Sequence, residues 1–140
     1  AYIEYGKSLI IDIGTAATFC IIDKNGIFKG GGIAPGIGTT IKALAERTSR
    51  LSKITFEKPN NIIATDTINA IKSGFYYGWI SLVEGMVEKM LKAFGEPLPV
   101  IFTGGYSKVI FEEVTLKQQK IFDSILTMKG LKYIFERNTT

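Results

Sequence analysis

The segment over residues 8–23, SLIIDIGTAATFCIID, constrains the fold of this chain more than any other stretch. It holds two short apolar runs, residues 9–11 and residues 19–22, separated by small and polar residues. An unbroken apolar run of this length is typical of a strand that is covered on both faces. The segment therefore predicts two strands joined by a tight loop at one edge of a sheet.

The predicted loop carries groups that suit a phosphate site. The candidate binding residues are Gly14, Thr15, Ala16 and Thr18. Backbone N–H groups and hydroxyls beside small side chains allow a polyphosphate to approach closely. Short glycine motifs also occur in ordinary turns, so this segment alone leaves a phosphate loop and a plain hairpin equally open. Asp12, at the end of the first run, places a carboxylate beside the loop.

The composition limits the class of protein and the chemistry. With 140 residues, 46% hydrophobic and 21% charged, the chain suits one globular domain. No apolar run is long enough to cross a bilayer, so we expect no membrane contact. The sequence has no histidine. This excludes histidine triads and histidine-ligated zinc, and leaves carboxylates, lysines and hydroxyls to carry any reaction.

Charge and cysteine content bear on partners and compartment. The net charge is +4, but the basic residues are scattered among acidic ones, so a nucleic-acid partner is not expected. An anionic small ligand suits the sign equally well. The single cysteine, Cys20, excludes an internal disulfide and fits a reducing compartment. No signal-like leader is seen, so we expect a cytoplasmic protein.

The remaining pattern predicts an alternation of strands and helices. We expect a helix end before Gly6 and a turn at Asn25 and Gly26. Strands are expected over residues 27–33, 62–64 and 98–102, with an edge strand near 54–56 inside a connection over 48–61. Helices are expected over residues 37–47, 66–94, 107–113 and 126–136. In the last helix Leu131, Ile134 and Phe135 are expected to face inward. Residues 115–124 are ambiguous.

The helix over residues 66–94 is the longest predicted element, and it contains three interior glycines. Each costs about 1 kcal/mol of helix stability relative to alanine, which close packing must offset. Gly74 and Gly78 lie one turn apart and leave a flat patch, beside which Tyr76, Tyr77 and Trp79 add aromatic area. A subunit or domain interface and a buried core helix both explain this pattern.

A second glycine loop follows the strand over residues 98–102. It consists of Thr103, Gly104 and Gly105, and a helix is expected just after it. Such a junction exposes helix N–H groups, which favour anions or the edge of a nucleotide. A simple strand-to-helix turn explains the same residues, so both interpretations stay open.

Three antiparallel strands followed by alternating helices and strands resemble a ribonuclease-H-like domain, the half-unit of the actin, sugar-kinase and heat-shock ATPase superfamily. The resemblance implies an α/β fold with one mixed sheet flanked by helices. Topology alone leaves the function open.

Six motifs in order extend the resemblance over nearly the whole chain. They are DIGTAATF from Asp12, GGGIAPGI from Gly30, ALAERTSRL from Ala43, DTINAIKSGFYYG from Asp66, FTGG from Phe102 and LKYIFERN from Leu131. Each motif is weak alone, but together they resemble the second half of a type III pantothenate kinase.

The resemblance implies ATP-dependent phosphorylation of pantothenate, the first step of coenzyme A biosynthesis, by a cytoplasmic dimer. With the glycine patch of the long helix, we expect a homodimer that associates through residues 66–94. It implies Mg²⁺ with ATP and a monovalent cation, K⁺ or NH₄⁺. Asp12 matches the cation ligand and Thr67 a pantothenate contact. Thr15 matches an ATP contact in a phosphate loop with Gly14, Ala16 and Thr18, while Thr103, Gly104 and Gly105 face the nucleoside side. Hard cations prefer carboxylate oxygen, which agrees with Asp12.

Two departures from the family pattern stand out. Asp66 precedes Thr67 where the family commonly has asparagine, which adds a negative charge beside the expected pantothenate contact. The family also has a first domain that supplies another phosphate loop and the aspartate that acts as general base. Neither motif occurs here. The resemblance therefore implies that these residues form one domain, which is the C-terminal half of a two-domain kinase. It also implies that the catalytic aspartate lies upstream and that this half is inactive without the first one. Two alternatives remain: a non-enzymatic nucleotide-binding or assembly domain, and another sugar kinase.

Overall fold

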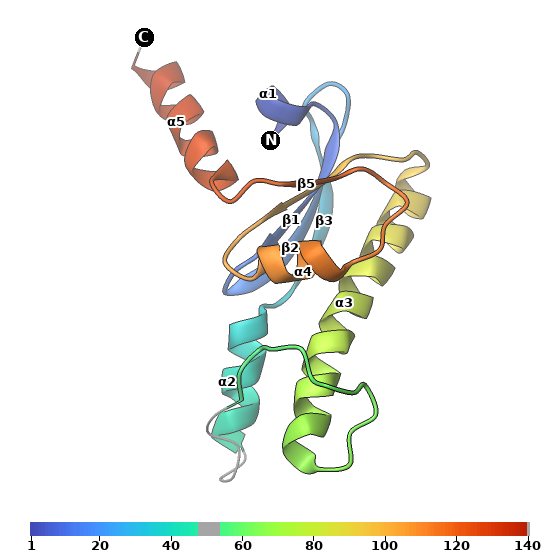
Figure 1. The fold of residues 1–140 in the computed structure, drawn as a ribbon. Coiled ribbons are helices and arrows are strands. Elements are labelled where there is room, and N and C mark those ends of the chain that lie inside the picture. The colour runs from blue at the N-terminus through green and yellow to red at the C-terminus, as the bar shows by residue number, and fades with distance from the viewer. Residues whose placement is uncertain (48–53, 140) are drawn as a thin grey trace.

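The computed structural model describes residues 1–47 and 54–139. The described residues form α1 (Tyr2–Tyr5), β1 (Ser8–Ile13), β2 (Ala16–Ile22), β3 (Phe28–Pro35), α2 (Ile37–Arg47), α3 (Thr67–Phe94), β4 (Val100–Thr103), α4 (Ser107–Glu113), β5 (Lys120–Phe122) and α5 (Leu126–Asn138) (Figure 1). The part of the predicted connection over residues 48–53 lies outside the described residues.

The strands form one mixed sheet in the order β3-β2-β1-β4-β5. β1, β2 and β3 pair antiparallel, whereas β4 pairs parallel with β1 and β5 parallel with β4. Three antiparallel strands therefore lead into helix-linked parallel strands. The α/β prediction, with one mixed sheet flanked by helices, is confirmed, and the strand order agrees with a ribonuclease-H-like domain.

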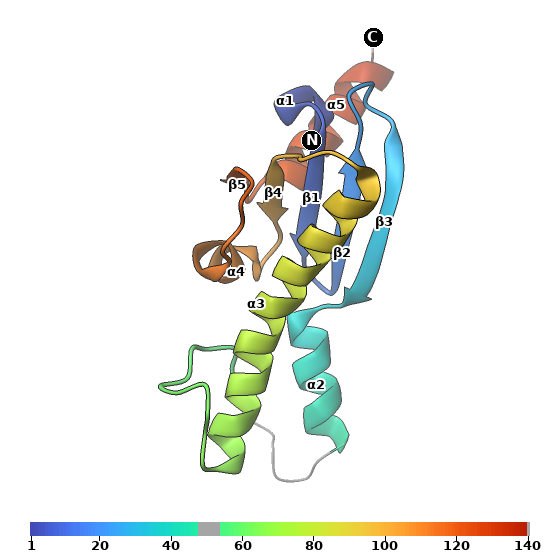
Figure 2. The same cartoon turned by 90° about the vertical axis from the view of Figure 1, so that its right-hand side faces the viewer.

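The hydrophobic core lies on one face of this sheet. Leu9, Ile11 and Ile13 alternate along β1 and are fully buried. Val83 of α3 and Ile110 of α4 belong to the same buried cluster, so these two helices cover the same face (Figure 2). Because strand side chains alternate, Asp12 lies on the opposite face from this core.

The glycines of β3 have two structural roles. The pairing of β2 with β3 shifts register between Ile21 and Ile22, which marks a bulge, and Gly30 beside it has a φ of 103°. A Cβ on Gly31 would lie 1.8 Å from the carbonyl oxygen of Phe19. The strand therefore needs glycine both to bend and to approach its neighbour.

Two predicted strands are absent from the structure. Residues 54–56 and 62–64 are irregular, and Ile62 and Ile63 are exposed. The Ile62 carbonyl instead accepts a hydrogen bond from the Ser73 hydroxyl, which ties this segment to α3. A run of three apolar residues was too short a signal for a strand. The ambiguous segment over residues 115–124 contains the short strand β5.

Helix α3 buries only part of its apolar surface. Ile68 and Leu82 are exposed, and the buried face is formed by Tyr76, Trp79, Val83, Val87 and Leu91. Apolar residues surround much of this helix, so spacing alone did not fix which side faces the sheet. Asp66 is the N-cap of this helix, because its carboxylate accepts a hydrogen bond from the Asn69 N–H at 3.0 Å.

The prediction that Leu131, Ile134 and Phe135 face inward is wrong. α5 forms as expected, but all three side chains are exposed, and Leu126 is its single buried residue among the described ones. The reason is the placement of α5, which extends away from the sheet (Figure 1) and contacts α1 through Lys129 and Tyr133.

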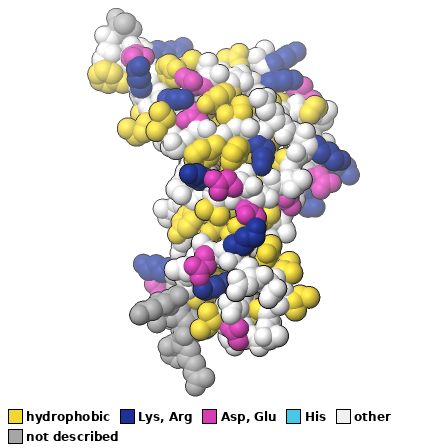
Figure 3. All heavy atoms as spheres, viewed as in Figure 1, with side chains coloured by type: hydrophobic (Ala, Val, Ile, Leu, Met, Phe, Trp, Pro, Cys, Tyr) yellow, Lys and Arg dark blue, Asp and Glu magenta, His cyan; other side chains and the backbone are white. Residues whose placement is uncertain are grey.

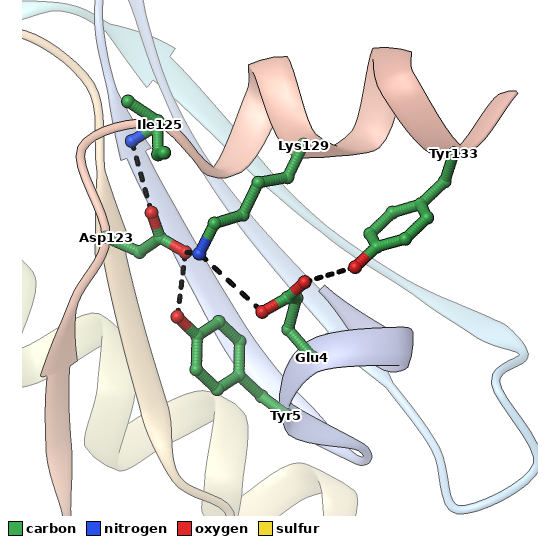
Figure 4. A network of polar contacts seen from close by, with 6 residues as sticks. All are labelled: Glu4, Tyr5, Asp123, Ile125, Lys129 and Tyr133. Carbon is green, nitrogen blue, oxygen red and sulfur yellow. Dashed lines mark hydrogen bonds and ion pairs between the residues drawn. The ribbon is translucent and has the colours of Figure 1, made fainter. Parts of the chain in front are cut away.

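A polar network fastens α5 to α1. The buried Asp123 carboxylate accepts hydrogen bonds from the Tyr5 hydroxyl and the Lys129 ammonium, both at 2.7 Å (Figure 4). Lys129 also pairs with Glu4 at 3.6 Å, and the Tyr133 hydroxyl donates to the same Glu4. Five side chains far apart in the sequence thus join the first helix to the last.

This network makes part of the stability depend on pH. Burial raises the pKa of the Asp123 carboxyl, but hydrogen bonds from Lys129, Tyr5 and the Ile125 N–H outweigh it and hold the pKa below its usual value of 3.8. A lowered pKa contributes stability above the unfolded value, and this contribution is lost as the pH falls through the folded value.

We therefore expect Asp123→Asn to lower the free energy of unfolding at pH 7, and the difference from wild type to shrink below about pH 3.8. Urea unfolding of both proteins between pH 7 and pH 3 measures this difference. A difference that stays constant over that range would contradict a charged Asp123 in the folded chain.

Candidate active site

The predicted site residues meet where β1 ends. In the sheet register Asp12 lies beside Thr18 of β2 and beside Thr103 of β4. Because β1 and β4 are neighbouring parallel strands, the loop after β1 and the loop after β4 leave the same edge of the sheet. A carboxylate and two hydroxyls are thereby set side by side on adjacent strands.

The loop after β4 approaches Asp12 closely because it contains glycine. Gly104 has a φ of 97°, and a Cβ there would lie 2.4 Å from Asp12 Oδ1 and 2.7 Å from the Ile13 N and O atoms. Only a residue without a side chain allows this contact. The Tyr106 N–H donates to the Ile13 carbonyl at 3.2 Å, which fixes the loop against β1.

A third loop completes the arrangement, and sequence reasoning did not assign it to the site. The Gly36 N–H donates to the Thr15 carbonyl at 2.9 Å, and the Thr39 hydroxyl donates to the same oxygen at 2.8 Å. A Cβ on Gly36 would lie 2.0 Å from the Gly14 carbonyl oxygen. The available signal was the glycine of the GGGIAPGI motif that stands between a strand and a helix.

The structure thus gathers most of the predicted residues at one edge. Asp12, Gly14, Thr15, Ala16, Thr18, Thr103, Gly104 and Gly105 belong to β1, β2, β4 and the loops between them. Thr15 and Gly105 are exposed, whereas Thr103 is buried and its carbonyl accepts the Ser107 hydroxyl. Small residues that let a phosphate approach the backbone, together with a nearby carboxylate, can bind a phosphate and its cation.

Thr67 lies apart from this group. It is the first residue of α3, and it precedes Tyr76 by two and a half helical turns, about 14 Å along the axis. Tyr76 is connected to the loop edge through aromatic contacts, at 5.4 Å to Phe56 and then 5.9 Å from Phe56 to Tyr106. The described residues therefore place Thr67 away from the predicted ATP contacts.

Tyr76, the last of these aromatic residues, has a hydrogen bond to Glu113 of α4. Burial, with a hydrogen bond to Glu113, raises the pKa of Tyr76 to about 12, so its phenol stays protonated at neutral pH. Lys58 binds the same Glu113 carboxylate at 3.0 Å. The segment that carries Phe56 is thus held against Tyr106, next to the loop after β4.

A cation at Asp12 would need ligands beyond protein carboxylates. Among residues 1–47 and 54–139, no group of three or more His, Cys, Asp or Glu side chains could hold a metal ion. One carboxylate with backbone carbonyls, water and substrate phosphates is a donor set that fits Mg²⁺ or a monovalent cation. The residues present therefore fit a cation that binds together with a phosphate.

Comparison with known proteins identifies the family. The model of the family described as type III pantothenate kinase matches residues 1–89. The chain belongs to the type III pantothenate kinase family. The matched residues include β1, β2, β3 and their loops, so Asp12 and the loop after β1 lie in the matched part, whereas the loop after β4 lies beyond it.

Relatives among the type III pantothenate kinases match the chain along its length. One from Caulobacter vibrioides is 44% identical over 99% of this chain and 53% of its own length, and one from Koribacter versatilis is 40% identical over 99% and 50%. The chain spans about half the length of these relatives, which it matches as a C-terminal part.

A solved structure supports the fold. It is titled a conserved putative Baf family transcriptional activator from Campylobacter jejuni, and it superposes with a TM-score of 0.60 over 95% of this chain and 59% of its own. The identity is 24%. This likeness concerns the fold alone.

The described helices also bear on membrane contact. In residues 1–47 and 54–139, no helix combines the length and the apolar content that a bilayer span requires. The expected cytoplasmic location stays a prediction.

Proposed function

We propose that this chain is the C-terminal half of a type III pantothenate kinase and supplies its cation site and one side of its ATP site. The observation that carries the proposal is the meeting of three glycine-containing loops at the end of β1, one of them in close contact with Asp12, in a chain of this family. Phosphoryl transfer depends on positioning and charge neutralisation more than on covalent help from the protein. An edge built from backbone groups, hydroxyls and one carboxylate suits that task.

Each predicted residue has a role in this proposal. Asp12 binds a monovalent cation, K⁺ or NH₄⁺, and Mg²⁺ arrives with ATP. Gly14, Thr15, Ala16 and Thr18 contact the phosphates, while Thr103, Gly104 and Gly105 lie on the nucleoside side. The pantothenate contact at Thr67, with Asp66 beside it, stays a prediction.

In this proposal the general base, which takes the proton from pantothenate, lies in the N-terminal half of the longer relatives, before the segment that matches this chain. The chain matches about half of their length, and among its described residues no group of three or more His, Cys, Asp or Glu side chains could hold a metal ion. We therefore expect residues 1–140 alone to leave ATP unhydrolysed. Pantothenate phosphorylation by these residues alone would contradict an upstream base.

The function is tested on the full protein, including its preceding half. It is incubated with ATP, Mg²⁺ and K⁺, and with pantothenate or a panel of sugars, while ADP and 4′-phosphopantothenate are measured. We expect ADP to appear only with pantothenate, with one phosphopantothenate for each ADP. ATP binding without pantothenate-dependent turnover would favour a nucleotide-binding or assembly domain, and turnover with a sugar would favour a sugar kinase.

We also propose that the protein forms a homodimer through α3. An apolar groove runs between the end of β3, α2 and the first half of α3. Its lining includes Pro35, Leu44, Ile71, Gly74, Phe75 and Gly78. Added side chains at Gly74 and Gly78 would meet no atom within 4 Å, so this patch is open, whereas Tyr76 and Trp79 are buried in the core. The long helix therefore serves both the core and an available surface.

We expect Gly78→Glu to convert the dimer into a monomer without unfolding it, because the new side chain enters the open groove. Gly85→Glu is the matched control, since Gly85 lies on the same helix with the same open space but does not line the groove. Sedimentation of the full protein measures the mass. Equal masses for the two variants would contradict association through this groove.

A further inference from the structure

The irregular segment in front of α3 is held in place near both of its ends. We call this segment, residues 54–66, the strap. Near its start the Phe56 ring packs edge-on against Tyr106, with ring centroids 5.9 Å apart. Near its end the Ile62 carbonyl accepts a hydrogen bond from the buried Ser73 hydroxyl of α3. Side-chain contacts therefore fix a segment that has no regular secondary structure of its own.

Charged side chains of the strap add further contacts. The Lys58 ammonium donates to both oxygens of the Glu113 carboxylate, at 3.0 Å each, and Glu57 pairs with Lys72 of α3. Glu113 is the last residue of α4, and it also accepts a hydrogen bond from the Tyr76 phenol. Acidic and basic side chains lie next to one another where α4 meets the strap (Figure 3). Glu113 therefore joins the strap, α3 and α4.

The two ends of the strap adjoin the two parts of the proposed substrate site. Tyr106 directly follows Gly105, and its N–H donates to the Ile13 carbonyl at 3.2 Å, so its ring belongs to the loop after β4. At the other end Asp66 caps α3 and precedes Thr67. One stretch of chain thus runs from the expected ATP contacts to the expected pantothenate contact.

We propose that Lys58 and Ser73 are positioning residues, each for a different substrate. The inference rests on the proposed function, in which the loop after β4 contacts ATP and Thr67 contacts pantothenate. Lys58 holds Phe56 against Tyr106, which sets the position of the loop after β4. Ser73 holds the end of the strap, which sets the path of the chain into Thr67. Small displacements of such supporting groups weaken the binding of the substrate that they position.

Equilibrium binding of ATP and of pantothenate to the full protein tests this division. Lys58→Met removes the ammonium but keeps most of the side chain, so we expect the Kd of ATP to rise at least fivefold and that of pantothenate less than twofold. Ser73→Ala removes only the hydroxyl, and we expect the reverse, a rise of at least fivefold for pantothenate and less than twofold for ATP. Lys58→Arg keeps a cation for Glu113 and should bind ATP within twofold of wild type.

Two control variants carry the same chemical changes outside these contacts. Lys117→Met changes an exposed lysine in the connection after α4, and Ser81→Ala changes an exposed serine of α3. We expect both Kd values of both controls to stay within twofold of wild type. Urea midpoints of all five variants are measured alongside, which separates weaker binding from a less stable fold.

The other outcomes each overturn the proposal. Equal weakening of both ligands by Lys58→Met or by Ser73→Ala means that the contact only stabilises the fold. Unchanged Kd values in both variants mean that the strap does not position the site, and a Lys58→Arg protein as weak as Lys58→Met means that the ion pair with Glu113 is not the cause. Pantothenate-dependent ADP release by wild type is measured in parallel. Its absence would contradict the kinase assignment, whereas the two Kd values judge the strap independently of turnover.

Discussion

We expect replacement of Gly104 by alanine to destabilise the protein by about 3 kcal/mol and to remove the proposed kinase activity of the full protein. The residue has a φ of 97°, a conformation in which a side chain is strained. The new Cβ would also lie 2.4 Å from Asp12 Oδ1 and 2.7 Å from the backbone of Ile13. Both partners belong to the central strand, so the loop after β4 must move away from Asp12.

Gly105→Ala provides the matched control. The residue is the next one in the same loop, its φ is not positive, and an added Cβ would meet no atom within 4 Å. We expect its urea midpoint to stay within experimental error of wild type. If both variants unfold at the same urea concentration, the close approach of Gly104 to Asp12 does not hold the loop.

Gly36→Ala is expected to cost a similar free energy of unfolding, about 3 kcal/mol, for a different reason. Its backbone is not strained, but the new Cβ would lie 2.0 Å from the Gly14 carbonyl oxygen and 2.6 Å from the Thr15 carbonyl oxygen. The loop after β3 would have to separate from the loop after β1. Its N–H would then lose the 2.9 Å hydrogen bond to Thr15.

Gly14→Ala changes the other partner of the contact between Gly36 and Gly14, and it distinguishes an effect on protein stability from an effect on ATP binding. A Cβ on Gly14 would be 3.8 Å from Asp12 Oδ1, an ordinary van der Waals distance. We therefore expect a urea midpoint close to wild type, together with weaker ATP binding if phosphate approaches this loop. A Gly36→Ala protein as stable as the Gly14→Ala protein would contradict the packing of the two loops.

The strand and loop pattern around Asp12 could be predicted because its signals are local. An apolar run that ends in Asp-x-Gly-Thr predicts a strand and a turn whatever the rest of the chain does, and the same holds for the run that ends at Thr103. The pairing of Asp12 with Thr18 and Thr103 then follows from the strand order. Gly36 was missed because its partner, Gly14, is distant in the sequence.

The side of a helix that faces the core could not be predicted in the same way. In α5 the apolar spacing is correct, but Leu131 and Phe135 are exposed because Lys129 and Tyr133 bind α1 instead. In α3 apolar residues occupy several sides, and only the sheet selects Val83 and Val87 as the buried ones. Such choices depend on contacts between distant segments.

The potassium dependence of pantothenate phosphorylation by Asp12→Asn tests the central assignment most directly. Asparagine keeps the shape of the side chain but removes the charge that a cation requires. In the full protein we expect wild type to be activated as K⁺ is titrated at fixed Mg²⁺ and ATP, and Asp12→Asn to lose at least tenfold of that activation while its urea midpoint is retained. An unchanged response to K⁺ in Asp12→Asn would contradict Asp12 as the cation ligand of this site.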